Sequence, residues 1–266
     1  VLFRSVHMSN HQQIVPKELF VPFRPLNIET TIPKDETLKE LFDALINDMG
    51  LSEEAIAKMQ KFTPKKQWQF IQGQAYVDSM SPSPECFLEY LKTAPNITVI
   101  NSLYVNLSNG KVSWMERFIK DGLSFLISLL TKTKDKDMDV FCMVLQCLHA
   151  IANVDVGQKA MLKETELFDF LIKSFEVKNS KAFGYILSLC IPFIYYSSNH
   201  SKVAKKFADA NVYNTIKKTC ENNPDHITIR QIVVFLTAMI FNFQEMKDRI
   251  DFIIFLYQSK LLDTLQ

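Results

Sequence analysis

Residue types that could carry chemistry are present in this sequence, but their spacing forms no catalytic or metal site. The five histidines and five cysteines are scattered, with no HExxH pattern and no CxxC pair. Asn109-Gly110-Lys111 resembles the end of a phosphate-binding loop, but that loop needs glycine five positions before its Gly-Lys pair, where Val105 stands. No GxSxG motif of a nucleophilic serine is present. We therefore predict a protein that is not an enzyme and has no metal or cofactor of its own.

Composition narrows the class of protein further. Of 266 residues, 47% are hydrophobic and 22% are charged, so the chain can bury a core. A net charge of +1 gives no general attraction to nucleic acid or anionic membranes. Residues 182–196 form the most apolar run, which contains Pro192 and is shorter than the ~20 residues that span a bilayer. We expect no transmembrane segment, reduced thiols and a cytoplasmic protein.

The first 110 residues predict small helical elements without a repeat. We interpret residues 1–8 as a remnant of an expression vector and the proline-containing residues 9–32 as an extended arm. Residues 33–110 should form a small helical subdomain, with helices that start after Ser52, at Thr63-Pro64 and at Ser83-Pro84. The composition of residues 77–84 predicts a linker between two of these helices.

Residues 96–130 join this subdomain to the part of the chain in which a helical pattern repeats. Its first helix should end at Asn109-Gly110 through a left-handed glycine, and Ser113 should cap the next helix. The pattern that follows Phe118 recurs at Leu162, Phe207 and Leu256. Each repeat should have a shorter amphipathic helix around this anchor and then a longer, more apolar helix. A helical period of 44 to 49 residues is typical of armadillo or HEAT arrays. We predict an all-α protein with an armadillo-like solenoid over residues 111–266, truncated at its C-terminus.

The long helices of such a solenoid line a groove. We expect them at 138–153, 182–197 and 228–243, and their small polar ends are Asn153, Ser197 and Asn242. Asparagine also favours plain helix C-caps, so either role is open for these positions. The predicted groove residues are those on the second face of two long helices: Met143, Cys147, Ala150, Asn153, Val234, Ala238 and Asn242. The alternative for this second face is burial against the next repeat.

Three segments together resemble the N-terminal regulatory region of diaphanous-related formins. They are MGLSEEAIAKMQKFTPKKQWQFI (49–71), LYVNLSNGKVSWMERFIKDGLSFLISLL (103–130) and VLQCLHAIANVDVGQKAMLKETELFDFLI (144–172). The resemblance implies that residues 33–110 are a GTPase-binding subdomain and that the chain binds a Rho-family GTPase in its GTP state. GTP and magnesium would be bound only by that partner. It also implies that the groove holds a C-terminal autoinhibitory segment of the same polypeptide, that actin is bound by a missing C-terminal half, and that the protein acts at the cytoskeleton or cell cortex.

The resemblance also assigns contact residues. Val105, Asn106 and Asn109 match positions where the family meets the GTPase, whereas Gly110-Lys111 depart from its usual sequence. Lys61, Lys65 and Lys66 form a basic cluster beside Trp68 that could attract the acidic partner, although they could equally be a solvated face with Trp68 in the core. We expect Trp114 to pack between the two parts. The alternative function is an armadillo-type scaffold or peptide or cargo adaptor unrelated to GTPases.

Overall fold

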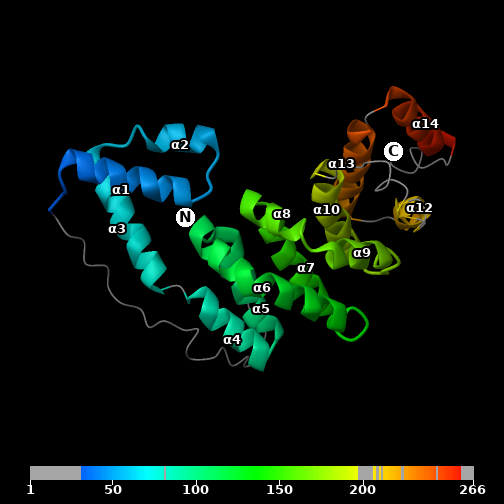
Figure 1. Ribbon diagram of the computed structural model, residues 1–266, viewed down its shortest axis with the longest axis horizontal. Coiled ribbons are helices and arrows are strands. Elements are labelled where there is room, and N and C mark those ends of the chain that lie inside the picture. The colour runs from blue at the N-terminus through cyan, green and yellow to red at the C-terminus, as the bar shows by residue number, and fades with distance from the viewer. Residues whose placement is uncertain are drawn as a thin grey trace.

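The computed structural model describes residues 31–80, 82–196, 206–207, 210, 212–222, 225–243 and 245–258. The predicted vector remnant, nearly all of the predicted arm and Ser197 lie outside these residues. Every regular element in the described part is a helix, as predicted. The chain runs as an elongated row of helices, from α1 at one end to α14 at the other (Figure 1).

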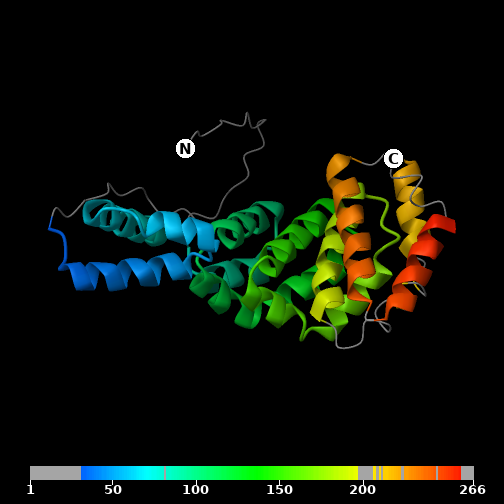
Figure 2. The same cartoon turned by 90° about the horizontal axis from the view of Figure 1, so that it is seen from above.

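The first three helices form a separate lobe at one end of this row. They are α1 (Asp35–Asp48), α2 (Glu53–Met59) and α3 (Pro64–Met80). Leu38, Phe42 and Ile46 recur on one face of α1, and all three are buried. The Phe42 ring lies 6.3 Å from that of Phe62 and 6.1 Å from that of Phe70, which gives the lobe a small aromatic core. Seen from above, this lobe projects from the remaining helices (Figure 2).

The remaining helices form stacked units. They are α4 (Pro84–Thr93), α5 (Ile97–Asn109), α6 (Val112–Thr133), α7 (Met138–Ala152), α8 (Asp155–Met161), α9 (Thr165–Lys173), α10 (Ser180–Tyr196), α12 (Val212–Glu221), α13 (His226–Asn242) and α14 (Met246–Gln258). Like helices lie against like: α5 packs on α7, α7 on α10 and α10 on α13, while α4 packs on α6 and α6 on α8. This stacking is that of an armadillo-like array, as the sequence period predicted.

One continuous core runs through these units. It extends from Phe87 to Leu256 and includes residues from α4 and α5. These two helices therefore pack with the repeats, although they precede residue 111, where the sequence pattern placed the start of the repeats. No single described helix combines the length and apolar character of a membrane span; α7 and α8 reach that level only together, and they meet at 117°.

Three helices start where the local sequence predicted. The Ser52 Oγ accepts a hydrogen bond from the Ala55 N–H at 3.4 Å, and the Ser83 Oγ accepts one from the Cys86 N–H at 3.2 Å. Helix α3 begins at Pro64, in the first helical position where the missing N–H of proline carries no cost. These caps depend on residues three or four apart, which explains why they can be read from the sequence.

Three local predictions were wrong. Gly110 ends α5 in extended backbone, with φ −76°, and not in a left-handed turn; in the described part the left-handed glycine is Gly50, with φ 61°. Ser113 does not cap α6, since its own N–H and hydroxyl donate to Asp48. Residues 77–80 continue helix α3, so the predicted linker between α3 and α4 is only the short connection up to Ser83.

Candidate functional site

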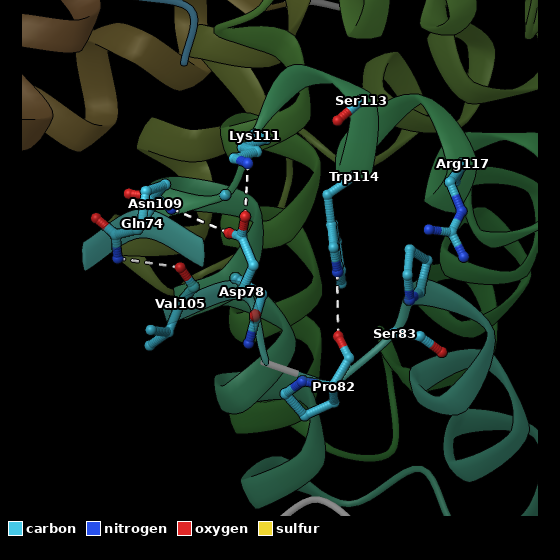
Figure 3. A pocket seen from close by; sticks show the side chains of 13 residues that line it. Gln74, Asp78, Pro82, Ser83, Val105, Asn109, Lys111, Ser113, Trp114 and Arg117 are labelled. Carbon is cyan, nitrogen blue, oxygen red and sulfur yellow. Dashed lines mark hydrogen bonds and ion pairs between the residues drawn. The ribbon is translucent and has the colours of Figure 1, made fainter. Parts of the chain in front are cut away.

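A cavity lies where the N-terminal lobe meets the repeats. Its volume is about 560 Å³, and four segments line it: the end of α3, the connection to α4, the end of α5 and the start of α6 (Figure 3). The lining residues are Gln74, Asp78, Pro82, Ser83, Pro84, Val105, Asn106, Asn109, Gly110, Lys111, Ser113, Trp114 and Arg117. Three of the six predicted GTPase-binding residues, Val105, Asn106 and Asn109, are therefore brought together here.

Helix α5 presents these three residues from its last two turns. The helix is fixed at its start by the Asn96 Oδ1, which accepts from the Val99 N–H at 3.0 Å. One face of α5 carries the buried side chains of Leu103 and Leu107. Val105 and Asn109 lie on the opposite face, which therefore looks outward. Val105 is 48% exposed, so its apolar side chain is available at the mouth of the cavity.

Two asparagines near the end of α5, Asn106 and Asn109, are held against their own helix. The Asn106 Nδ2 donates to the Ser102 carbonyl at 2.9 Å, and the Asn109 Nδ2 donates to the Val105 carbonyl at 3.0 Å. These bonds orient each amide, and its oxygen can still accept hydrogen bonds. Asn109 is exposed and Asn106 is half-buried. The end of α5 thus combines an apolar side chain with two oriented amides, a combination that suits a protein partner.

Trp114 forms an inner wall of the cavity. Its Nε1–H donates to the Pro82 carbonyl at 3.1 Å, and its ring stacks on that of Phe118 at 5.7 Å and meets that of Phe87 edge-on at 5.9 Å. The close approach of Phe118 depends on Gly122, because a Cβ at this position would lie 2.5 Å from the Phe118 ring. Trp114 joins α6 to the connection before α4, in agreement with its predicted packing role.

The charged side chains around the cavity are already paired. The Lys111 Nζ lies 2.5 Å from the Asp78 Oδ2, and the Gln74 Nε2 donates to the other oxygen of Asp78 at 3.0 Å. Arg117 binds both carboxylate oxygens of Glu85, at 2.9 and 2.7 Å. The pKa of Glu85 is lowered, first by a hydrogen bond from its own backbone N–H and then by Arg117. These ion pairs fix the connection between α3, α4 and the start of α6 around the cavity.

The basic cluster lies elsewhere on the lobe. Lys61, Lys65 and Lys66 are exposed near the start of α3, whereas Asp78 lies near its end. Thirteen residues of helix separate Lys65 from Asp78, which corresponds to ~20 Å. The Lys66 Nζ lies 3.9 Å from the centre of the Phe62 ring, so its charge is held over an aromatic face. Trp68 is half-buried. The lysines therefore do not join the cavity.

The predicted groove residues fall into two groups. Cys147 and Ala238 are wholly buried and Ala150 is 7% exposed, so these three are not on a groove surface. The Cys147 thiol faces the Ile100 carbonyl of α5 at 3.6 Å, which shows that this side of α7 packs on the preceding unit. Met143 and Asn242 are half-buried, while Asn153 and Val234 are exposed. The Asn242 Nδ2 donates to the Ala238 carbonyl at 2.8 Å.

Sequence reasoning missed part of the inner face of the long helices α7, α10 and α13. On α7 this face carries Cys142 and His149, and the His149 ring meets that of Tyr185 on α10 edge-on at 5.9 Å. Burial lowers the pKa of His149 and raises that of Tyr185. The spacing of Cys142, His149 and Asn153 was a visible signal, but α7 has two apolar faces, and of these three residues only Asn153 was predicted. Sequence reasoning also missed Gln74 and Asp78, because Asp78 fell in the predicted linker.

The fold and the cavity together define a class: a helical-repeat protein with a separate N-terminal lobe and a cavity at the junction between the lobe and the repeats. The family model of the Diaphanous GTPase-binding Domain matches residues 30–191. The chain belongs to this family, and the predicted resemblance to the N-terminal regulatory region of diaphanous-related formins is confirmed.

Individual relatives agree with this assignment. The chain is 28% identical over 176 residues to human Protein diaphanous homolog 3, and 23% identical over 236 residues to Formin-E of Dictyostelium discoideum. These alignments cover 58% and 85% of this chain, and 15% of each relative. Among solved structures, E. histolytica Formin1 bound to EhRho1-GTPgammaS matches with a TM-score of 0.63 at 14% identity, over 85% of this chain and 86% of that one.

Proposed function

We propose that this chain is a regulatory module that binds a Rho-family GTPase in its GTP-bound state. The observation that carries the proposal is the convergence of Val105, Asn106 and Asn109 on one cavity, at the junction between the lobe and the repeats. The family resemblance assigns the same three residues to the GTPase contact. A partner seated there would touch both parts of the molecule. The similar fold of a formin bound to EhRho1-GTPgammaS supports the same partner class.

We propose further that the inner face of α7, α10 and α13 holds an amphipathic autoinhibitory helix from the C-terminal part of the same polypeptide. Exposed and half-buried side chains along this face support the proposal, among them Met143, Asn153, Val234 and Asn242, together with Cys142, His149 and Tyr185. Val234 is 45% exposed and supplies apolar surface for such a helix. If GTPase and helix favour incompatible states, each weakens the other by the same factor.

In the whole protein this exchange would control actin filament assembly. The chain spans 15% of the length of the curated relatives described above. We propose that the actin-binding part lies outside this chain. We propose that the protein works at the cytoskeleton or the cell cortex, where formins act. The GTP and magnesium would belong to the GTPase.

Nucleotide-dependent capture tests the proposed function. Immobilised chain is offered a panel of Rho-family GTPases loaded with a non-hydrolysable GTP analogue or with GDP. We expect capture of at least one member in the GTP-like state and much weaker capture in the GDP state. Equal capture in both states, or none across the panel, would contradict the proposal and would favour an armadillo-type scaffold that uses the groove alone.

The basic cluster gives a kinetic prediction. Replacing Lys65 and Lys66 with glutamine should slow association of the GTPase several-fold and flatten its salt dependence, because exposed charges outside the contact act through long-range attraction. Dissociation should change little. Stopped-flow mixing at several ionic strengths measures both rates. The matched control replaces Lys159 and Lys163, exposed on the repeats, with glutamine. A change confined to dissociation would show that the lysines make direct contacts.

A further inference from the structure

The N-terminal lobe shares little apolar core with the repeats. In the described part of the chain, the continuous core begins at Phe87, and the buried side chains of α1 lie outside it. Leu38, Phe42 and Ile46 pack within the lobe instead, together with the rings of Phe62 and Phe70. Apolar burial therefore holds the lobe together but does little to fix its orientation on the repeats. Other contacts must set this orientation.

A carboxylate of the lobe caps the longest helix of the repeats. Asp48, the last residue of α1, accepts hydrogen bonds from the Ser113 N–H at 2.8 Å and from the Ser113 hydroxyl at 2.7 Å. The local N-cap residue of α6 is Lys111, which makes no side-chain cap. A negative charge is favourable there, since the first N–H groups of a 22-residue helix are unpaired and its dipole is positive at this end. Asp48 supplies the cap from 65 residues away.

A second carboxylate binds next to the first. Asp78, near the end of α3, pairs with Lys111 at 2.5 Å, and Figure 3 shows this pair beside the cavity. The turn after α1 also approaches closely: a Cβ at Gly50 would lie 3.2 Å from the Val112 Cγ2, and the φ of 61° at Gly50 favours glycine. Three consecutive residues, from Lys111 to Ser113, thus receive contacts from the end of α1, from the turn after it and from the end of α3. We call this set the clasp.

We propose that Asp48 and Asp78 are positioning residues, which hold the lobe at the angle that lets one GTPase touch both the lobe and the end of α5. This inference rests on the proposed function. A partner that must contact two parts binds only the fraction of molecules in which these parts are correctly placed, and its apparent dissociation constant rises as that fraction falls. Loss of the Asp48 contact should therefore weaken GTPase binding without removing any residue that lines the cavity. It should leave the repeats folded, because neither carboxylate belongs to their core.

The test compares three substitutions in α1. Asp48→Ala removes the cap. Asp48→Asn keeps a side-chain oxygen that can accept the hydrogen bonds from Ser113, and asparagine caps helix N-termini well. Glu40→Ala is the control, because it removes an exposed carboxylate from the same helix. The angle of the lobe is followed by the spin-label distance between Lys39→Cys and Lys159→Cys, in a chain whose half-buried thiols are replaced by Cys86→Ser and Cys142→Ser. Affinity and melting temperature are measured on the same variants.

We expect Asp48→Ala to broaden the distance distribution and to raise the dissociation constant for the GTP-loaded GTPase about tenfold, mainly through slower association. Asp48→Asn should restore both properties in large part, and Glu40→Ala should change neither. An unchanged distance distribution in Asp48→Ala would contradict the proposal that Asp48 positions the lobe. A broadened distribution with unchanged affinity would contradict the proposal that this position matters for GTPase binding. If the unsubstituted chain captures no GTPase, the proposed function fails; the distance measurement then still decides whether Asp48 holds the lobe.

Discussion

Replacing Val105 with aspartate should weaken binding of the GTP-loaded GTPase by about 30-fold or more. Central interface positions typically cost about 2 kcal/mol or more when disrupted, and this substitution also places a charge where a partner would exclude water. The fold should be unaffected, because Val105 is 48% exposed and the α5 core faces the other way. Titration calorimetry gives the affinity, and circular dichroism checks that the helices melt as in the unsubstituted chain.

The matched control is Ser108→Asp. Ser108 is exposed on the same helix, three residues further on, and does not line the cavity. It adds the same charge near the same helix end, so any general electrostatic or helix-dipole effect appears in both variants. We expect a change of less than about threefold for Ser108→Asp. Equal losses in the two variants would remove the end of α5 from the proposed GTPase site.

Replacing Phe118 with alanine should have the largest effect on stability. The side chain lies on α6 and is 0% exposed. Its ring stacks on that of Trp114 within the core of the repeats. Truncation of a buried phenylalanine costs about 3–5 kcal/mol, through lost burial and the cavity that remains. In a chain of this length, such a change should lower the melting temperature by roughly 10 °C. Thermal unfolding followed by circular dichroism measures this change.

Phe241→Ala is the counterpart on the surface. Phe241 is 66% exposed on α13, so its truncation removes little buried area. We expect a stability change within about 0.5 kcal/mol, as for most exposed positions. Equal melting temperatures for Phe118→Ala and Phe241→Ala would contradict the claim that Phe118 is buried and stabilises the junction.

The sequence alone determined the features that depend on neighbouring residues. The caps at Ser52 and Ser83 join atoms three residues apart, so residue types and spacing suffice to predict them. The repeated apolar pattern predicted three long helices, and these begin at residues 138, 180 and 226 as stacked inner helices. The family was also readable, since its resemblance is spread over ordered segments. Val105, Asn106 and Asn109 were chosen on this basis, and they share one cavity.

Only the tertiary structure decided which partner each group meets. Helix α7 is apolar on two faces, and its sequence does not say that Cys147 packs on α5 while His149 meets Tyr185 of α10. The cap of α6 comes from Asp48 across 65 residues, and the ion pair of Lys111 comes from Asp78 across 33. Periodicity records how much of a helix is buried, but it carries no information about which distant segment covers it. The cavity and the clasp arise from such distant contacts, and for that reason they become visible only in the folded chain.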